Sequence, residues 1–158
     1  LITVAILYCS MSHIPFEGAG ELHISGIREA REGGTSQFDR VITTCQDSIE
    51  DNVSSSCEYS WYNMSDGEVD GWGGSSDYVL FEQAADELHD ALLDGETVLI
   101  HCHHGHSRSV SVATAALGRY LGLSWHEAYH HIYRYRITPH PPERILIDHA
   151  SRYIDERT

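Results

Sequence analysis

Residues 97–109 read TVLIHCHHGHSRS, and this stretch decides the local fold. The apolar run that ends at Cys102 predicts a buried strand, and Ser107 opens a helical pattern that continues to Gly122. Residues 103–106 therefore form a strand-to-helix turn. In a parallel α/β sheet such turns lie at the carboxyl ends of the strands, where ligands bind.

The residue types in this turn favour phosphate chemistry. A glycine-containing turn that leads into a helix N-terminus directs backbone N–H groups inward and makes an anion site. The same field lowers the pKa of a cysteine placed at Cys102. Arg108, in the first helical turn, can bind two phosphate oxygens with its planar guanidinium. The pattern favours a thiolate nucleophile beneath a bound phosphoryl group.

The rest of the chain alternates strands and helices before a helical final third. Further β-type runs, each bounded by Gly, Asp, Asn or Ser, occupy residues 21–25, 40–45 and 59–64. Helical patterns occupy residues 26–33, 75–95, 107–122, 124–136 and 141–156. Ser76 or Asp77 can cap the second helix, Ser124 and Glu127 form a capping box, and prolines lie in the first turn of the last helix. We expect one α/β domain, residues 1–158, with a central, mainly parallel sheet of four to five strands flanked by helices.

The charge balance restricts the partners. The chain has 158 residues and a formal net charge of −14, from 24 acidic and 10 basic residues, and every basic residue is an arginine. We expect no nucleic-acid partner, because binding a phosphate backbone requires clustered basic residues. An acidic surface without lysine resembles the proteins of salt-loving archaea.

Two further features concern the cellular setting. No apolar run approaches the length of a membrane helix, and residues 1–8 are expected to form a strand or an arm. The four cysteines (Cys9, Cys45, Cys57 and Cys102) are too few and scattered for a disulfide framework. We expect a cytoplasmic monomer that does not bind a membrane.

The stretch HCHHGHSRS matches His-Cys-x5-Arg-Ser, the phosphate-binding loop signature of the cysteine-dependent protein tyrosine phosphatase superfamily. Its Gly-x-Ser-Arg-Ser ending resembles the dual-specificity branch. Residues 81–102, 21–27 and 38–47 also resemble the helix and strands around that loop, so the similarity covers most of residues 21–155. The resemblance implies the three-layer sandwich of those enzymes.

This resemblance also implies the role of each loop residue. Cys102 would attack phosphorus to give a phosphocysteine, while Arg108 and the loop N–H groups stabilise the equatorial oxygens. Ser109 would donate a hydrogen bond to the thiolate, and His101 would organise the loop from behind. The residues expected to bind substrate are His103, His104, Gly105, His106, Ser107 and Arg108.

In this family an aspartate on an upstream loop protonates the leaving group and then activates water. The candidates are Asp66 and Asp70, both in the Gly/Asp/Ser-rich segment 65–76. We favour Asp66, because it follows the predicted strand directly. Trp72, in the same segment, could shape the pocket entrance.

Four residues near the loop have two interpretations. His103, His104 and His106 could add positive potential below about pH 6.5, favouring highly anionic substrates, or could simply face solvent. Contiguous histidines in a tight turn make a poor zinc site, so no metal and no cofactor is predicted. Cys45 could form the reversible protective disulfide known in some of these phosphatases, or be a small buried hydrophobe.

The sequence therefore predicts a phosphatase that hydrolyses phosphotyrosine and phosphoserine or phosphothreonine in protein partners, without a metal. The alternatives are a phosphatase of the same fold acting on RNA 5′-phosphates or phosphoinositides, and a catalytically idle phosphate-binding protein.

Overall fold

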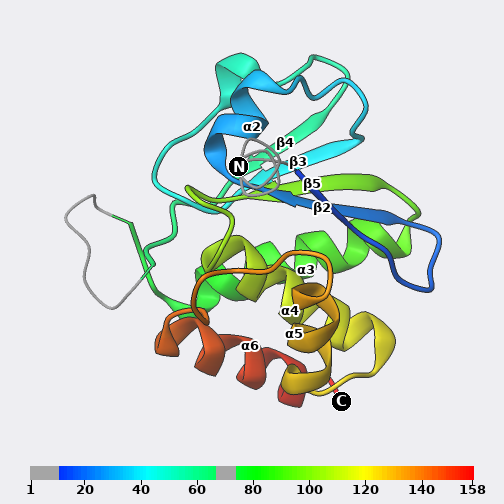
Figure 1. Ribbon diagram of the computed structural model, residues 1–158, viewed down its shortest axis with the longest axis vertical. Helices are drawn as coiled ribbons and strands as arrows, with labels where there is room; N and C mark the ends of the chain where they lie inside the picture. The colour runs from blue at the N-terminus through cyan, green and yellow to red at the C-terminus, as the bar shows by residue number, and fades with distance from the viewer. Residues whose placement is uncertain (1–10, 67–73) are drawn as a thin grey trace.

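The computed structural model describes residues 11–66 and 74–158, which form a five-stranded sheet between helical layers (Figure 1). The strands are β1 (Ser12–Ile14), β2 (Glu21–Ser25), β3 (Arg40–Thr43), β4 (Glu58–Trp61) and β5 (Thr97–His101). Their order is β1-β2-β5-β3-β4; β1 is antiparallel to β2 and the other pairs are parallel. The predicted mainly parallel sheet is confirmed. The strand or arm predicted for residues 1–8 lies outside the described residues.

Helices cover both faces of the sheet. One face carries α3 (Tyr78–Leu93), α4 (Arg108–Leu121), α5 (Trp125–Tyr133) and α6 (Arg144–Glu156). The other face carries α2 (Ile27–Glu32) and the short helix η1 (Glu50–Asn52), as Figure 1 shows. The three layers match the expected sandwich.

The central strand β5 explains why its sequence is apolar throughout. Val98 and Ile100 belong to the large hydrophobic core shared with the four-helix face, and Leu99 belongs to the smaller core beneath α2. All three side chains are fully buried. A strand covered on both faces has no solvent side on which a polar residue is favoured.

Several element boundaries differ from the predictions. β3 and β4 end at Thr43 and Trp61, short of the predicted ends at residues 45 and 64, and the segments that follow them contact Arg108 through Gln46 and Met64. Asp77 caps α3 by accepting a hydrogen bond from the Val79 N–H, and the predicted capping box of α5 is present. The prolines at 141 and 142 precede Glu143, the N-cap of α6, so their placement inside the first turn was wrong. No helix of the described ranges is long and apolar enough to cross a membrane.

Candidate active site

The Cys102 thiol lies at the carboxyl end of β5, at the base of the turn predicted from the sequence. Cys102 is 2% exposed, and its Sγ lies 3.2 Å from Ser109 Oγ and accepts a hydrogen bond from the Gly105 N–H at 3.3 Å. Burial alone raises the pKa of this thiol. The positive charge of Arg108 and the hydrogen bonds from Ser109 and Gly105 outweigh burial, so the pKa of Cys102 is lowered. The site favours a thiolate.

The carbonyl groups of the turn (the phosphate loop, residues 102–108) point away from Cys102. The carbonyl of His103 accepts from the Ile27 N–H at 2.9 Å, and the carbonyls of His104 and Gly105 accept from Arg136. The carbonyl and the following N–H of a peptide group point in opposite directions. Holding three carbonyls outward therefore directs the next three N–H groups toward the thiolate, where an oxyanion would bind.

Gly105 is required by this loop geometry. Its φ is +71°, a left-handed conformation that favours glycine. A Cβ at this position would also lie 2.5 Å from the Ser25 carbonyl oxygen at the end of β2. The loop therefore packs directly against the sheet. A side chain at residue 105 would prevent this contact.

Arg136 holds the loop from behind, and the sequence analysis did not single it out. This buried guanidinium donates from Nε to Gly105 O at 2.6 Å and from Nη2 to His104 O at 3.1 Å. From Nη1 it also donates to Ser12 Oγ (2.9 Å) and Ile24 O (3.2 Å) on β1 and β2. The only sequence signal was an arginine in the segment after α5, where Arg134 is an equally good candidate by pattern.

Arg108 occupies the position predicted for a phosphate-binding arginine. It begins α4, is 7% exposed, and donates from Nη1 to Gln46 Oε1 at 2.9 Å and Met64 O at 3.1 Å. Its buried Nε has no hydrogen-bond partner within the described ranges. Gln46 and the backbone of Met64 thus orient the guanidinium while leaving a donor free.

His101 is a buried neutral side chain behind the loop. Its Nδ1 lies 3.1 Å from the Cys102 carbonyl oxygen, which only accepts, so Nδ1 carries the proton. Nε2 then accepts from Thr43 Oγ1 at 2.7 Å, and Thr43 in turn accepts from the Tyr59 hydroxyl at 2.8 Å. Burial lowers the pKa of His101 to about 4. This chain of hydrogen bonds fits the supporting position expected for His101.

Of the two candidate acids, the structure describes Asp66 and not Asp70. Asp66 is half-buried, and its buried Oδ1 has no hydrogen-bond partner among residues 11–66 and 74–158. It lies two residues after Met64, whose carbonyl contacts Arg108, so this end of the segment reaches the site. Asp70 and Trp72 lie outside the described residues.

The three loop histidines do not share one environment. His103 Nε2 lies 2.7 Å from Asp47 Oδ2, which sequence reasoning did not anticipate. His104 is exposed, and its ring stacks on that of His106 with centroids 6.0 Å apart. Burial, followed by the charge of Arg136, lowers the pKa of His106. At neutral pH His106 therefore adds no positive charge to the loop.

The described cysteines, Cys45, Cys57 and Cys102, are all free thiols. Cys45 is fully buried and close enough to Cys102 for their charges to interact. Burial raises the pKa of Cys45 to about 11, so it is a protonated thiol at neutral pH. Cys57 donates to the carbonyls of Thr35 and Phe38, away from the loop.

Comparison with known proteins agrees with this geometry. Residues 35–148 match the family described as dual specificity phosphatase, catalytic domain, and the chain belongs to that family. It is a cysteine-dependent phosphatase that acts on phosphorylated substrates. A comparison with curated protein sequences finds no significant match.

Solved structures share the fold at low sequence identity. The chain is similar to human DUSP28 (16% identity, TM-score 0.67, covering 92% of this chain and 93% of that one). It is also similar to DUSP15 (18%, 0.68, 94% and 96%) and to PTPMT1 (16%, 0.66, 93% and 95%). These likenesses establish the fold alone.

Proposed function

We propose that this chain hydrolyses phosphotyrosine and phosphoserine or phosphothreonine in proteins through a phosphocysteine on Cys102. One observation carries the proposal: a thiol of lowered pKa lies within hydrogen-bond reach of Gly105 and Ser109, at the base of a loop whose carbonyls are held outward. Arg108, which begins the following helix, supplies the positive charge for the equatorial phosphoryl oxygens.

In the first step the Cys102 thiolate attacks phosphorus, and the phosphorus–oxygen bond to the leaving group breaks. Asp66 donates its proton to the departing oxygen, so that an alcohol or phenol leaves rather than its anion. Asp66 suits this role because its Oδ1 is buried and unpartnered in the described part of the chain.

In the second step water attacks phosphorus and gives its proton to the Asp66 carboxylate. The sulfur–phosphorus bond breaks, inorganic phosphate is released and the thiolate is restored. The Ser109 hydroxyl, 3.2 Å from Sγ, donates to the leaving thiolate. The remaining expected binding residues, His103, His104, His106 and Ser107, contribute backbone N–H groups around the phosphate.

The charges around the site support singly phosphorylated protein substrates. His103 is paired with Asp47, and the pKa of His106 is lowered, so two of the loop histidines add little free positive charge at pH 7. The whole chain carries a net charge of −14. We expect such a site to attract phosphoinositides and RNA ends weakly, because these two histidines supply little charge for the additional phosphates.

The test is hydrolysis of five substrates in EDTA: p-nitrophenyl phosphate, a phosphotyrosine peptide, a phosphoserine peptide, a phosphoinositide and a 5′-phosphorylated RNA. Both peptides should have a higher kcat/KM than the phosphoinositide and the RNA. Cys102→Ser should lower every rate at least about 10³-fold. Cys57→Ser is the matched control and should retain activity.

Activity that survives Cys102→Ser would exclude the thiolate mechanism. Faster hydrolysis of the phosphoinositide or the RNA would overturn the protein-substrate assignment while leaving the mechanism intact. Loss of activity with EDTA alone, in a chain that stays folded, would also contradict the proposal.

A further inference from the structure

Three side chains of types that can ligate a metal lie together on the β1–β2 hairpin, outside the phosphatase site. One donor atom from each of His13, Glu21 and His23 can be chosen so that all lie within 4.8 Å of one another. The two imidazoles stack with ring centroids 4.8 Å apart, and His23 Nε2 lies 3.7 Å from Glu21 Oε2. The carboxylate and both rings therefore lie side by side, and because an imidazole binds a metal in its ring plane, His13 has to rotate out of the stack to share an ion with His23.

The strand register produces this convergence. His13 of β1 lies directly opposite His23 of β2, and Glu21 lies two residues before His23, on the same face of the strand. Ile14 and Leu22, the neighbouring cross-strand pair, are fully buried on the opposite face. A slip of one residue would expose these apolar side chains, so the core holds the two histidines in register.

The hairpin leaves room for a ligand beside the cluster. His13 and Glu21 line a pocket of about 230 Å³, together with residues 14–16 and 18–20. His13 and Glu21 are exposed and free to change rotamer, whereas His23 is half-buried with its ring edge-on to Phe38. The cluster therefore has one side chain fixed by packing, His23, and two that can adjust, His13 and Glu21.

We propose that His13, Glu21 and His23 bind a zinc ion, with water as the fourth ligand, and that the ion fastens β1 to β2. Two imidazoles, one carboxylate and one open position are a ligand set that zinc uses in proteins. In a tetrahedral site with bonds of roughly 2.0–2.1 Å the donor atoms are about 3.4 Å apart, so the exposed His13 and Glu21 side chains have to close on His23.

The proposed ion lies beside the contacts by which Arg136 holds the phosphate loop, here called the clamp. The strand pair next to His13 and His23 is Ser12 and Ile24, the two residues that accept from Arg136 Nη1. Arg136 also holds the carbonyls of His104 and Gly105. Zinc would therefore stabilise the edge strand at the point where it supports the loop.

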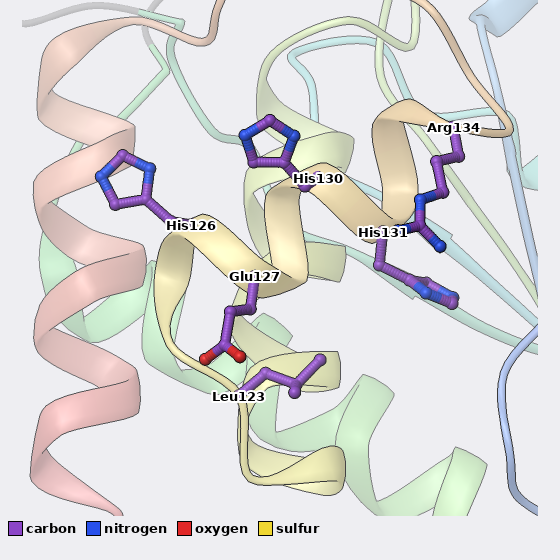
Figure 2. A pocket seen from close by; sticks show the side chains of 6 residues that line it. All are labelled: Leu123, His126, Glu127, His130, His131 and Arg134. Carbon is purple, nitrogen blue, oxygen red and sulfur yellow. The ribbon is translucent and has the colours of Figure 1, made fainter.

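A second histidine-rich surface, on α5, is the natural rival. A pocket of about 390 Å³ is lined by Leu123, His126, Glu127, His130, His131 and Arg134. In Figure 2 the side chains of His126 and His130 point up in the view and that of Glu127 points down, and in the described ranges their ligand atoms do not group within reach of one ion. His131 donates a hydrogen bond from Nε2 to the Pro15 carbonyl, so this nitrogen is not available to a metal. The positive charge of Arg134 also repels a cation. This surface serves as the control.

The test uses Co²⁺ as a spectroscopic probe and Zn²⁺ for stability, in a Cys102→Ser background that removes the reactive thiolate. We expect one Co²⁺ per chain with a visible spectrum of nitrogen and oxygen ligands and no thiolate charge-transfer band. His13→Gln and Glu21→Gln should each weaken binding at least about tenfold, and His130→Gln should not. Zn²⁺ should raise Tm in the parent and not in His13→Gln.

Unchanged binding in His13→Gln, loss of binding in His130→Gln, or a thiolate band would each overturn the proposal. Because the Cys102→Ser chain is used throughout, failure here is independent of the proposed phosphatase mechanism. His23 is left intact, since it packs on Phe38 and its loss could unfold the hairpin.

Discussion

At the scale of single residues, the site depends on charge placed around one buried thiol. Cys102 is buried, which opposes ionisation, yet its pKa is lowered because Arg108 and two hydrogen-bond donors surround it. Cys102, Arg108 and Ser109 could be predicted because all three lie within one short motif. Gln46 and Arg136 could not, since their contacts with Arg108 and Gly105 span 62 and 31 residues of sequence.

The assignment of Asp66 as the acid makes a prediction about leaving groups. Asp66→Asn should lower kcat on a phosphotyrosine peptide by about 10²- to 10⁴-fold and the first step with p-nitrophenyl phosphate far less, because nitrophenolate leaves without a proton. The measurement is single-turnover kinetics on both substrates. Asp70→Asn is the matched comparison, and a larger selective loss there would move the acid to Asp70.

His101 links protonation to folding. Its pKa is about 4 in the folded protein against an ordinary value of 6.5, so the unfolded chain binds the proton more tightly. The contribution of His101 to stability is therefore full above pH 6.5 and is lost as the pH drops toward 4, by about 3 kcal/mol in total.

This loss of stability can be isolated by mutation. In urea unfolding across this pH range, His101→Gln should have a free energy of unfolding that depends less steeply on pH, by up to about 1.4 kcal/mol per pH unit. The exposed His126→Gln should keep the parent slope. A slope unchanged in His101→Gln would show that His101 is not a neutral buried group.

At the scale of elements, the helices could be predicted from local sequence signals, and the edge strand β1 could not. Helices α3 to α5 were predictable because their periodicity and caps are local signals, such as Asp77 for α3 and the Ser124–Glu127 box for α5. β1 was missed, because three residues with a polar Ser and His give no β pattern of their own. Its pairing with β2 and its contact with Arg136 identify it only in the folded chain.

The clamp predicts that Arg136 is a positioning residue. Arg136→Lys should lower kcat/KM by about 10- to 100-fold, because a single ammonium cannot hold both loop carbonyls in the geometry of the guanidinium. The loop N–H groups would then no longer point at the phosphate site. The pKa of Cys102 should rise, as measured by the pH profile of alkylation by iodoacetamide. Arg134→Lys, at an exposed neighbouring position, should leave both unchanged; an unaltered alkylation profile in Arg136→Lys would contradict the clamp.

At the scale of the whole molecule, the fold class and the family could be read from the sequence, but the sheet order could not. The order places β5 between β2 and β3, although β5 is the last strand in the sequence, and this brings Cys102 and Arg108 beside the segment after β3, where Cys45 and Gln46 lie. Long-range pairing of this kind leaves no local signal. That residues 1–158 form a single domain suited to high salt remains a prediction.

The most direct measurement of the central claim is mass spectrometry of the acid-quenched protein during turnover of p-nitrophenyl phosphate. Asp66→Asn helps here, since loss of the base in the second step allows the intermediate to accumulate. The account predicts one phosphoryl group on the sulfur of Cys102 and none in Cys102→Ser. A phosphoryl group on His103, His104 or His106, or turnover with no covalent adduct, would contradict it.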